Sequence, residues 1–62
     1  MTITVEKYIG GKRYIEGAYH STEDKPTDNI AAGSIMVETD SGDVYFYDGT
    51  TEAYVKQFSF QD

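Results

Sequence analysis

The 62-residue chain contains no cysteine and a single histidine, His20. The absence of cysteine excludes disulfides and thiolate metal ligands, and one histidine excludes a multi-histidine metal site within one chain. A chain of this length forms one small domain and buries only about 60% of the surface that its unfolded form exposes. We therefore expect no metal and no cofactor, and we expect local β structure or partner chains to supply the missing stability.

Long apolar runs and clustered basic residues are also missing. No run approaches the roughly 18 to 20 apolar residues of a membrane-spanning helix, and the opening MTITVEKY lacks the basic start and apolar middle of a signal peptide. Five basic residues against eleven acidic ones give a formal net charge of −6, whereas nucleic-acid backbones are bound by clustered Lys and Arg. The expectation is a protein made in the cytoplasm, with neither a membrane nor nucleic acid as its partner.

What the sequence does contain is a period-2 alternation of β-branched and aromatic residues, broken by Gly, Asp and Asn, with no sustained helical period. This pattern predicts an all-β fold, a small antiparallel meander of about five strands in a single domain, residues 1–62. An N-terminal hairpin (1–19), an irregular loop (20–33) and a three-strand meander (34–60) make up the domain. The expected strands are 1–9, 12–19, 34–39, 43–48 and 53–60.

The first hairpin is expected to turn at two adjacent glycines, which can take the positive φ of a two-residue turn. This turn pairs Val5 with Glu16 and Lys7 with Tyr14, so no clean apolar face emerges. In the loop that follows, Ser21 is expected to form a local cap with Asp24. The pattern also allows one helical turn at residues 29–32 of this loop.

The stretch VETDSGDVYFYDG, residues 37–49, predicts a second hairpin. If Asp40 and Ser41 are the central residues of a type I turn and Gly42 takes the left-handed bulge position, Thr39 pairs with Asp43. The first face of the hairpin then carries Ile35, Val37, Tyr45 and Tyr47, and the other carries Met36, Glu38, Val44 and Phe46.

Both faces of this hairpin are therefore apolar, although a meander this small covers only one face of its sheet. A second layer is expected, formed either by the N-terminal hairpin folded across or by another subunit. The last strand is expected to place Tyr54, Phe58 and Phe60 on one side. The candidates for core or interface are Ile35, Met36, Val37, Tyr45, Phe46, Tyr47, Tyr54 and Phe58.

Two groups of residues invite a chemical interpretation. Asp40, Asp43 and Asp48 lack the spacing of a calcium loop and are better explained as turn formers. His20 and Ser21 are adjacent on an extended chain, so they point to opposite sides and their spacing does not imply a catalytic arrangement. The sequence therefore predicts a protein that is not an enzyme.

The remaining excesses are of tyrosine and of acid. Tyrosines on a sheet serve as core, as a protein interface or as a platform for sugars, and the strand at 43–48 has no Lys or Arg to accompany its aromatics, as a nucleic-acid platform would need. The acidic residues in the second half of the chain are compatible with a DNA mimic that blocks a nucleic-acid enzyme. A solvent-exposed charged face explains the same residues as well. These acids are Glu38, Asp40, Asp43, Asp48 and Glu52.

The segment HSTEDKPTDNIAAGSIMVETDSGDVYFYDGTTEAYVK, residues 20–56, combines Ser-Thr-x-Asp-Lys-Pro-Thr, a Gly-Ser before a strand, and Glu-x-Asp-Ser-Gly followed by Tyr-x-Tyr-Asp-Gly. It resembles small virion-associated proteins encoded in tailed-phage structural gene clusters. Ser41 stands where Thr is usual in that family, and Tyr54 replaces a closing Trp. The matching residues are Ser21, Thr22, Asp24, Lys25, Pro26, Thr27, Gly33, Ser34, Glu38, Asp40, Gly42, Tyr45, Tyr47, Asp48 and Gly49.

The resemblance implies a component of the virion, either a capsid-associated or a head-tail accessory protein, that works by occupying a surface. The expected partners are further copies of the chain or a viral capsid or tail protein. Two alternatives remain open: an acidic intracellular inhibitor of a host protein, including the DNA mimic, and a carbohydrate-binding module.

Overall fold

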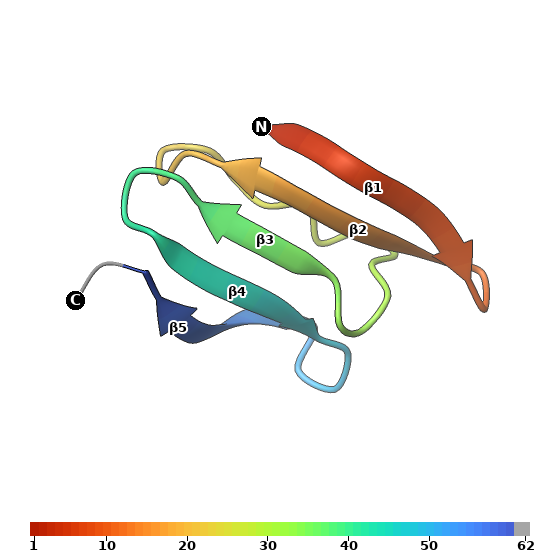
Figure 1. The fold of residues 1–62 in the computed structure, drawn as a ribbon. Coiled ribbons are helices and arrows are strands. Elements are labelled where there is room, and N and C mark those ends of the chain that lie inside the picture. The colour runs from red at the N-terminus through yellow and green to blue at the C-terminus, as the bar shows by residue number, and fades with distance from the viewer. Residues whose placement is uncertain (61–62) are drawn as a thin grey trace.

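The computed structural model describes residues 1–60, which form one five-stranded sheet without any helix (Figure 1). The strands lie in the sheet in the same order as in the chain. The prediction of an all-β fold of about five strands is confirmed. The strands are β1 (Thr2–Ile9), β2 (Lys12–Tyr19), β3 (Ile35–Glu38), β4 (Asp43–Asp48) and β5 (Ala53–Ser59).

The first hairpin has the predicted register. Val5 pairs with Glu16 and Lys7 pairs with Tyr14. Two glycines at positions 10 and 11 have φ of 58° and 83°, a conformation that costs glycine little because it has no Cβ. The glycine pair therefore sets both the turn and the pairing of β1 with β2.

The sheet is mixed, because β2 and β3 run parallel. Residues 20–34, here called the crossover loop, return the chain to the end of the sheet at which β2 begins, and β3 starts there. Only the pairs β1–β2, β3–β4 and β4–β5 are therefore antiparallel, as the predicted meander requires. The helical turn that the sequence allowed at residues 29–32 does not form. The backbone there bonds to Arg13 instead: the Arg13 N–H donates to the Asn29 carbonyl (2.9 Å) and the Ala31 N–H donates to the Arg13 carbonyl (2.7 Å).

The second hairpin is shifted by one residue from the predicted register. Gly42 does take a positive φ (78°), but Glu38 pairs with Asp43 and Thr39 does not. The reason is tertiary, since both the N–H and the hydroxyl of Thr39 donate to the carbonyl of Tyr19, at 2.8 and 3.1 Å. Thr39 is thereby held against β2 and joins the turn.

This shift moves the side chains of β4 to the opposite face relative to those of β3. Met36 lies opposite Tyr45, not Phe46, and Ile35 lies opposite Phe46, not Tyr47. The predicted pairing of Val37 with Tyr45 and of Glu38 with Val44 is therefore also wrong. Because successive side chains on a strand point to opposite faces, the tyrosines of β4 share a face with Met36.

A second irregularity moves Phe58. The pairing of β4 with β5 shifts between Val44 and Tyr45, so Phe58 lies opposite Val44 while Lys56 lies opposite Tyr45. One extra residue on β5, Gln57, is left between them, as in a β-bulge. Phe58 consequently shares a face with Val55, and the prediction that it lies beside Tyr54 is wrong.

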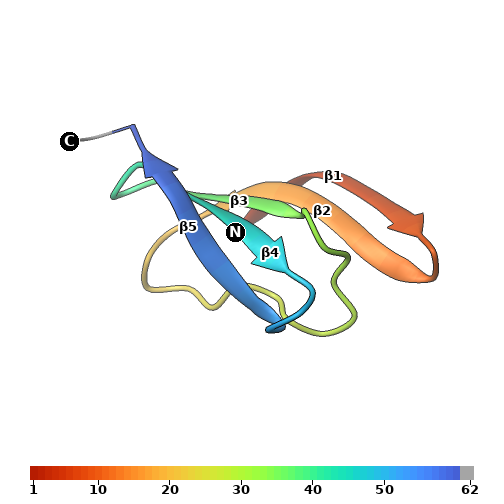
Figure 2. The ribbon, with the colours of Figure 1, turned by 90° about the horizontal axis from the view of Figure 1, so that it is seen from below.

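The crossover loop lies on one side of the sheet (Figure 2). We call that side the covered face and the opposite side the open face. The core is formed where the crossover loop meets the covered face, and Ile15 and Met36 are fully buried there. The layer over this face is therefore the crossover loop, and the expected N-terminal hairpin folded across is wrong, because β1 and β2 belong to the same sheet. Its members are Ile15, Tyr19, Ile30, Met36 and Tyr47, with Ile3, Tyr45 and Tyr54 packed against them.

Candidate functional site

The open face carries two rows of mostly apolar residues that run across all five strands. The register places Ile35, Val37, Phe46 and Phe58 here, so half of the predicted core or interface residues belong to this face. The first row is Val5, Glu16, Ile35, Phe46 and Val55, and the second is Thr2, Ala18, Val37, Val44 and Phe58.

Several side chains of the open face remain accessible to solvent. Phe46 is 37% exposed, Val55 44% and Phe58 49%, and the ring of Phe58 stacks edge-on against that of Phe60, with centroids 5.3 Å apart. With side chains of about 150 to 200 Å² each, these three exposed fractions amount to roughly 240 Å². Phe60, which is 71% exposed, adds about 140 Å², so the apolar patch is on the order of 400 Å². A patch of this size equals the largest found on typical monomeric proteins, and such patches are often functional.

The charged residues of the open face balance one another. The register places two lysines, Lys7 and Lys12, and two acids, Glu16 and Asp48, on this side of the sheet. Tyr14 lies among them: its hydroxyl donates to Glu16 (2.7 Å) and the Lys7 ammonium stands 5.3 Å from its ring centroid. The net charge of −6 therefore resides elsewhere on the chain.

The other four predicted core or interface residues, Met36, Tyr45, Tyr47 and Tyr54, lie on the covered face. There Tyr47 and Tyr54 pack edge to face, with ring centroids 5.1 Å apart. The hydroxyl of Tyr54 donates to the carbonyl of Pro26 (2.7 Å). Burial, together with the nearby Tyr47, raises the pKa of Tyr54 to about 12. Tyr54 therefore stays neutral and fastens the crossover loop to β5.

Lys25 of the crossover loop belongs to the Asp-Lys-Pro-Thr motif but was not predicted as a core, interface or binding residue. Its ammonium lies 4.6 Å from the ring centroid of Tyr19, 4.5 Å from that of Tyr45 and 5.4 Å from that of Tyr54. It also donates a hydrogen bond to the Tyr19 hydroxyl oxygen (3.0 Å). We call these three tyrosines the tyrosine cage. The excess of tyrosine was visible in the sequence, but the lysine that the rings surround was not.

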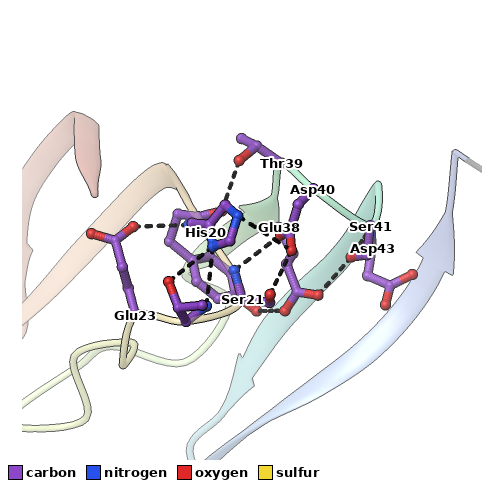
Figure 3. Close-up of polar contacts among 10 residues, drawn as sticks. His20, Ser21, Glu23, Glu38, Thr39, Asp40, Ser41 and Asp43 are labelled. Atoms are coloured by element: carbon purple, nitrogen blue, oxygen red, sulfur yellow. Dashed lines mark hydrogen bonds and ion pairs between the residues drawn. The ribbon is translucent and has the colours of Figure 1, made fainter.

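A polar cluster lies at the end of β2, where the crossover loop begins and the β3–β4 turn approaches it (Figure 3). The carboxylate of Asp40 accepts hydrogen bonds from the N–H and hydroxyl of Ser21, and these bonds lower the pKa of Asp40. The predicted cap of Ser21 by Asp24 is therefore wrong. Because the Ser21 hydroxyl donates to Asp40, with the His20 ring 3.6 Å from the same carboxylate, serine and histidine do not form a nucleophile-base pair.

The other acids of the hairpin are also bound within the chain. Glu38 accepts from the hydroxyls of Tyr19 and Ser41, both at 2.6 Å. Asp43 lies 3.5 Å from the Lys56 ammonium, and Asp48 accepts from the N–H of Thr50 (2.8 Å), as expected for a turn former. Among residues 1–60 no three or more His, Asp or Glu side chains gather as metal ligands would.

The fold and these surfaces define a small all-β protein with one apolar sheet face closed by its own loop and the other left open. Within the part of the chain that the structure describes, no helix is long and apolar enough to cross a membrane. No family model, no curated protein and no solved structure matches the chain.

Proposed function

We propose that this protein is a non-enzymatic virion accessory protein that works through protein-protein contacts made by the open face. The observation that carries the contact function is the accessible apolar surface of Phe46, Val55 and Phe58 on a sheet whose opposite face already has its core. The place in a phage particle is supported by the resemblance of residues 20–56 to tailed-phage structural proteins.

The partner that fits the open face best is a second copy of the chain. Two such faces packed against each other bury on the order of 1,000 Å², the size at which specific interfaces begin. The two lysines and two acids of this face cancel, so pairing two chains of net charge −6 brings no excess of like charge into the contact. A symmetric pair of this kind would form a β-sandwich, with the sheets about 10 Å apart.

The self-association is tested by measuring the molar mass of the purified chain over a range of concentrations by light scattering. We expect the mass of two chains at high concentration and of one chain on dilution. A single-chain mass at every concentration would contradict the pairing of open faces.

The place in the virion needs a separate experiment. Mass spectrometry of purified phage particles is expected to find this chain at many copies per particle. Its absence from particles, in cells that contain the chain, would overturn the virion assignment.

The alternative of an acidic inhibitor would use Glu38, Asp40, Asp43 and Asp48 as phosphate mimics. Their internal hydrogen bonds and ion pair, described above, favour a role inside the fold. Loss of inhibition of a host nucleic-acid enzyme on changing all four to Asn or Gln would be required to support this alternative.

A further inference from the structure

We propose that the tyrosine cage is a binding site for an alkylammonium group, such as a lysine side chain of another protein, and that Lys25 fills it in the isolated chain. All three rings have their centroids within the distance of about 6 Å at which a cation is attracted to an aromatic face. The Lys25 ammonium lies between 4.5 and 5.4 Å from each. Three rings from β2, β4 and β5 thus converge on one cation.

The hydrogen bonds of the cage select for a cation that donates. The Tyr19 hydroxyl gives its proton to Glu38 (2.6 Å), so its oxygen is left to accept from the Lys25 ammonium (3.0 Å). Burial and the bond to Glu38 raise the pKa of Tyr19, which keeps that proton in place. The Glu38 carboxylate behind Tyr19 adds a negative charge that a neutral ligand would not exploit.

The cage adjoins a shallow cleft that is open to solvent. This cleft, of about 480 Å³, is lined by Asp24, Lys25, Thr27, Glu52, Ala53 and Tyr54. Lys25 and Tyr54 belong to both the cleft and the cage, and Asp24 and Glu52 bring two further carboxylates that attract a cation. Lys25 is half-buried, so its side chain can leave toward solvent without unpacking the core.

The cage and the open face lie on opposite sides of the sheet, so this inference stands apart from the proposed function. Self-association through the open face leaves the cage accessible. A partner lysine would then replace Lys25 by exchange of one ammonium for another, with little change in the charge of the site.

The experiment is a titration of the Lys25→Ala protein with n-butylammonium, which reproduces a lysine side chain, and with n-butanol as the neutral probe of the same length. Binding is followed by the NMR shifts of the Tyr19, Tyr45 and Tyr54 rings. We expect n-butylammonium to bind Lys25→Ala about tenfold more tightly than it binds the unchanged chain, in which the cage is internally occupied. We expect n-butanol to bind both proteins weakly and equally.

Lys7→Ala is the matched control, because the Lys7 ammonium stands over one ring, that of Tyr14, on the open face. It should bind n-butylammonium no better than the unchanged chain. Equal binding of n-butanol and n-butylammonium by Lys25→Ala, or an equal gain in Lys7→Ala, would overturn the proposal.

A measurement on the unchanged chain covers the case in which Lys25→Ala does not fold. Because the Lys25 ammonium lies within 5.4 Å of three ring centroids, the resonances of the methylene protons next to it should be shifted by ring currents. Saturating n-butylammonium should move them to the positions of a free lysine while the sheet resonances stay unchanged. If these protons keep their positions at saturation, the cage is a closed internal contact and the proposal is wrong.

Discussion

Replacing Phe46 by threonine should weaken the pairing of open faces while leaving the sheet folded. Threonine retains a high preference for strands, and Phe46 is 37% exposed, so part of its ring is free for a partner. Of a side-chain area of about 200 Å², this fraction leaves about 75 Å². At about 25 cal/mol per Å² the exposed part contributes roughly 2 kcal/mol per chain on association.

In a symmetric pair this loss counts twice, because each chain contributes one Phe46. Phe46→Thr should therefore weaken the free energy of association by roughly 4 kcal/mol, which raises the dissociation constant of the pair about a thousandfold. Sedimentation equilibrium measures this constant directly, and circular dichroism at the same concentrations reports whether the sheet is retained.

Tyr8→Thr is the control for this substitution. Tyr8 is 68% exposed, more than Phe46, but its pairing with Arg13 places it on the covered side of the sheet. It should leave the dissociation constant within a few-fold of the unchanged chain. If Tyr8→Thr weakens association as much as Phe46→Thr does, or if Phe46→Thr has no effect, the assignment of the interface to the open face is refuted.

Three further predictions concern the folded chain itself. Met36→Ala should lower the free energy of unfolding by about 2 to 5 kcal/mol, because Met36 is fully buried, and urea denaturation should show Tyr8→Ala costing far less. The Ser21 hydrogen bonds lower the pKa of Asp40, so their contribution is complete above about pH 4 and is lost as the pH falls through the lowered value. In acid titrations followed by circular dichroism, Ser21→Ala should reduce this loss, and an unchanged acid profile would contradict it. Burial raises the pKa of Tyr54 to about 12, so the folded state should lose stability as the pH rises from about 10 to about 12. Tyr54→Phe should remove one tyrosine from the late-ionising group seen in tyrosinate absorbance, a group that also contains Tyr19. A late-ionising amplitude equal to that of the unchanged chain would contradict the assignment to Tyr54.

Local rules were sufficient for the first hairpin. Two adjacent glycines can take positive φ, and a two-residue turn leaves one register for the flanking strands, so the pairing of Val5 with Glu16 followed from the sequence. The bounds of β2 and β4 were predicted on the same basis, because the alternation of apolar residues stops at the turn and loop residues that flank each strand. These features depend on residues that are neighbours in the chain.

The register of the second hairpin did not follow from local rules. The turn residues Asp40, Ser41 and Gly42 favour a pairing that begins at Thr39, but in the structure Thr39 instead donates two hydrogen bonds to the carbonyl of Tyr19. A residue twenty positions away therefore decided which side chains share a face. The expectation of a two-sided apolar hairpin was right, while the side chains of β4 were assigned to the wrong faces relative to those of β3.

The sequence by itself determined that the chain is all-β, where most strands lie, and that it has more apolar strand surface than a single small sheet can cover. Only the tertiary structure decided what covers each side. The crossover loop closes the face that carries Met36 and the tyrosine cage, because its return path makes β2 and β3 parallel and brings Lys25 over the rings. The open face is left with Phe46, Val55 and Phe58, and that asymmetry, which no local pattern encodes, selects the surface proposed for contact.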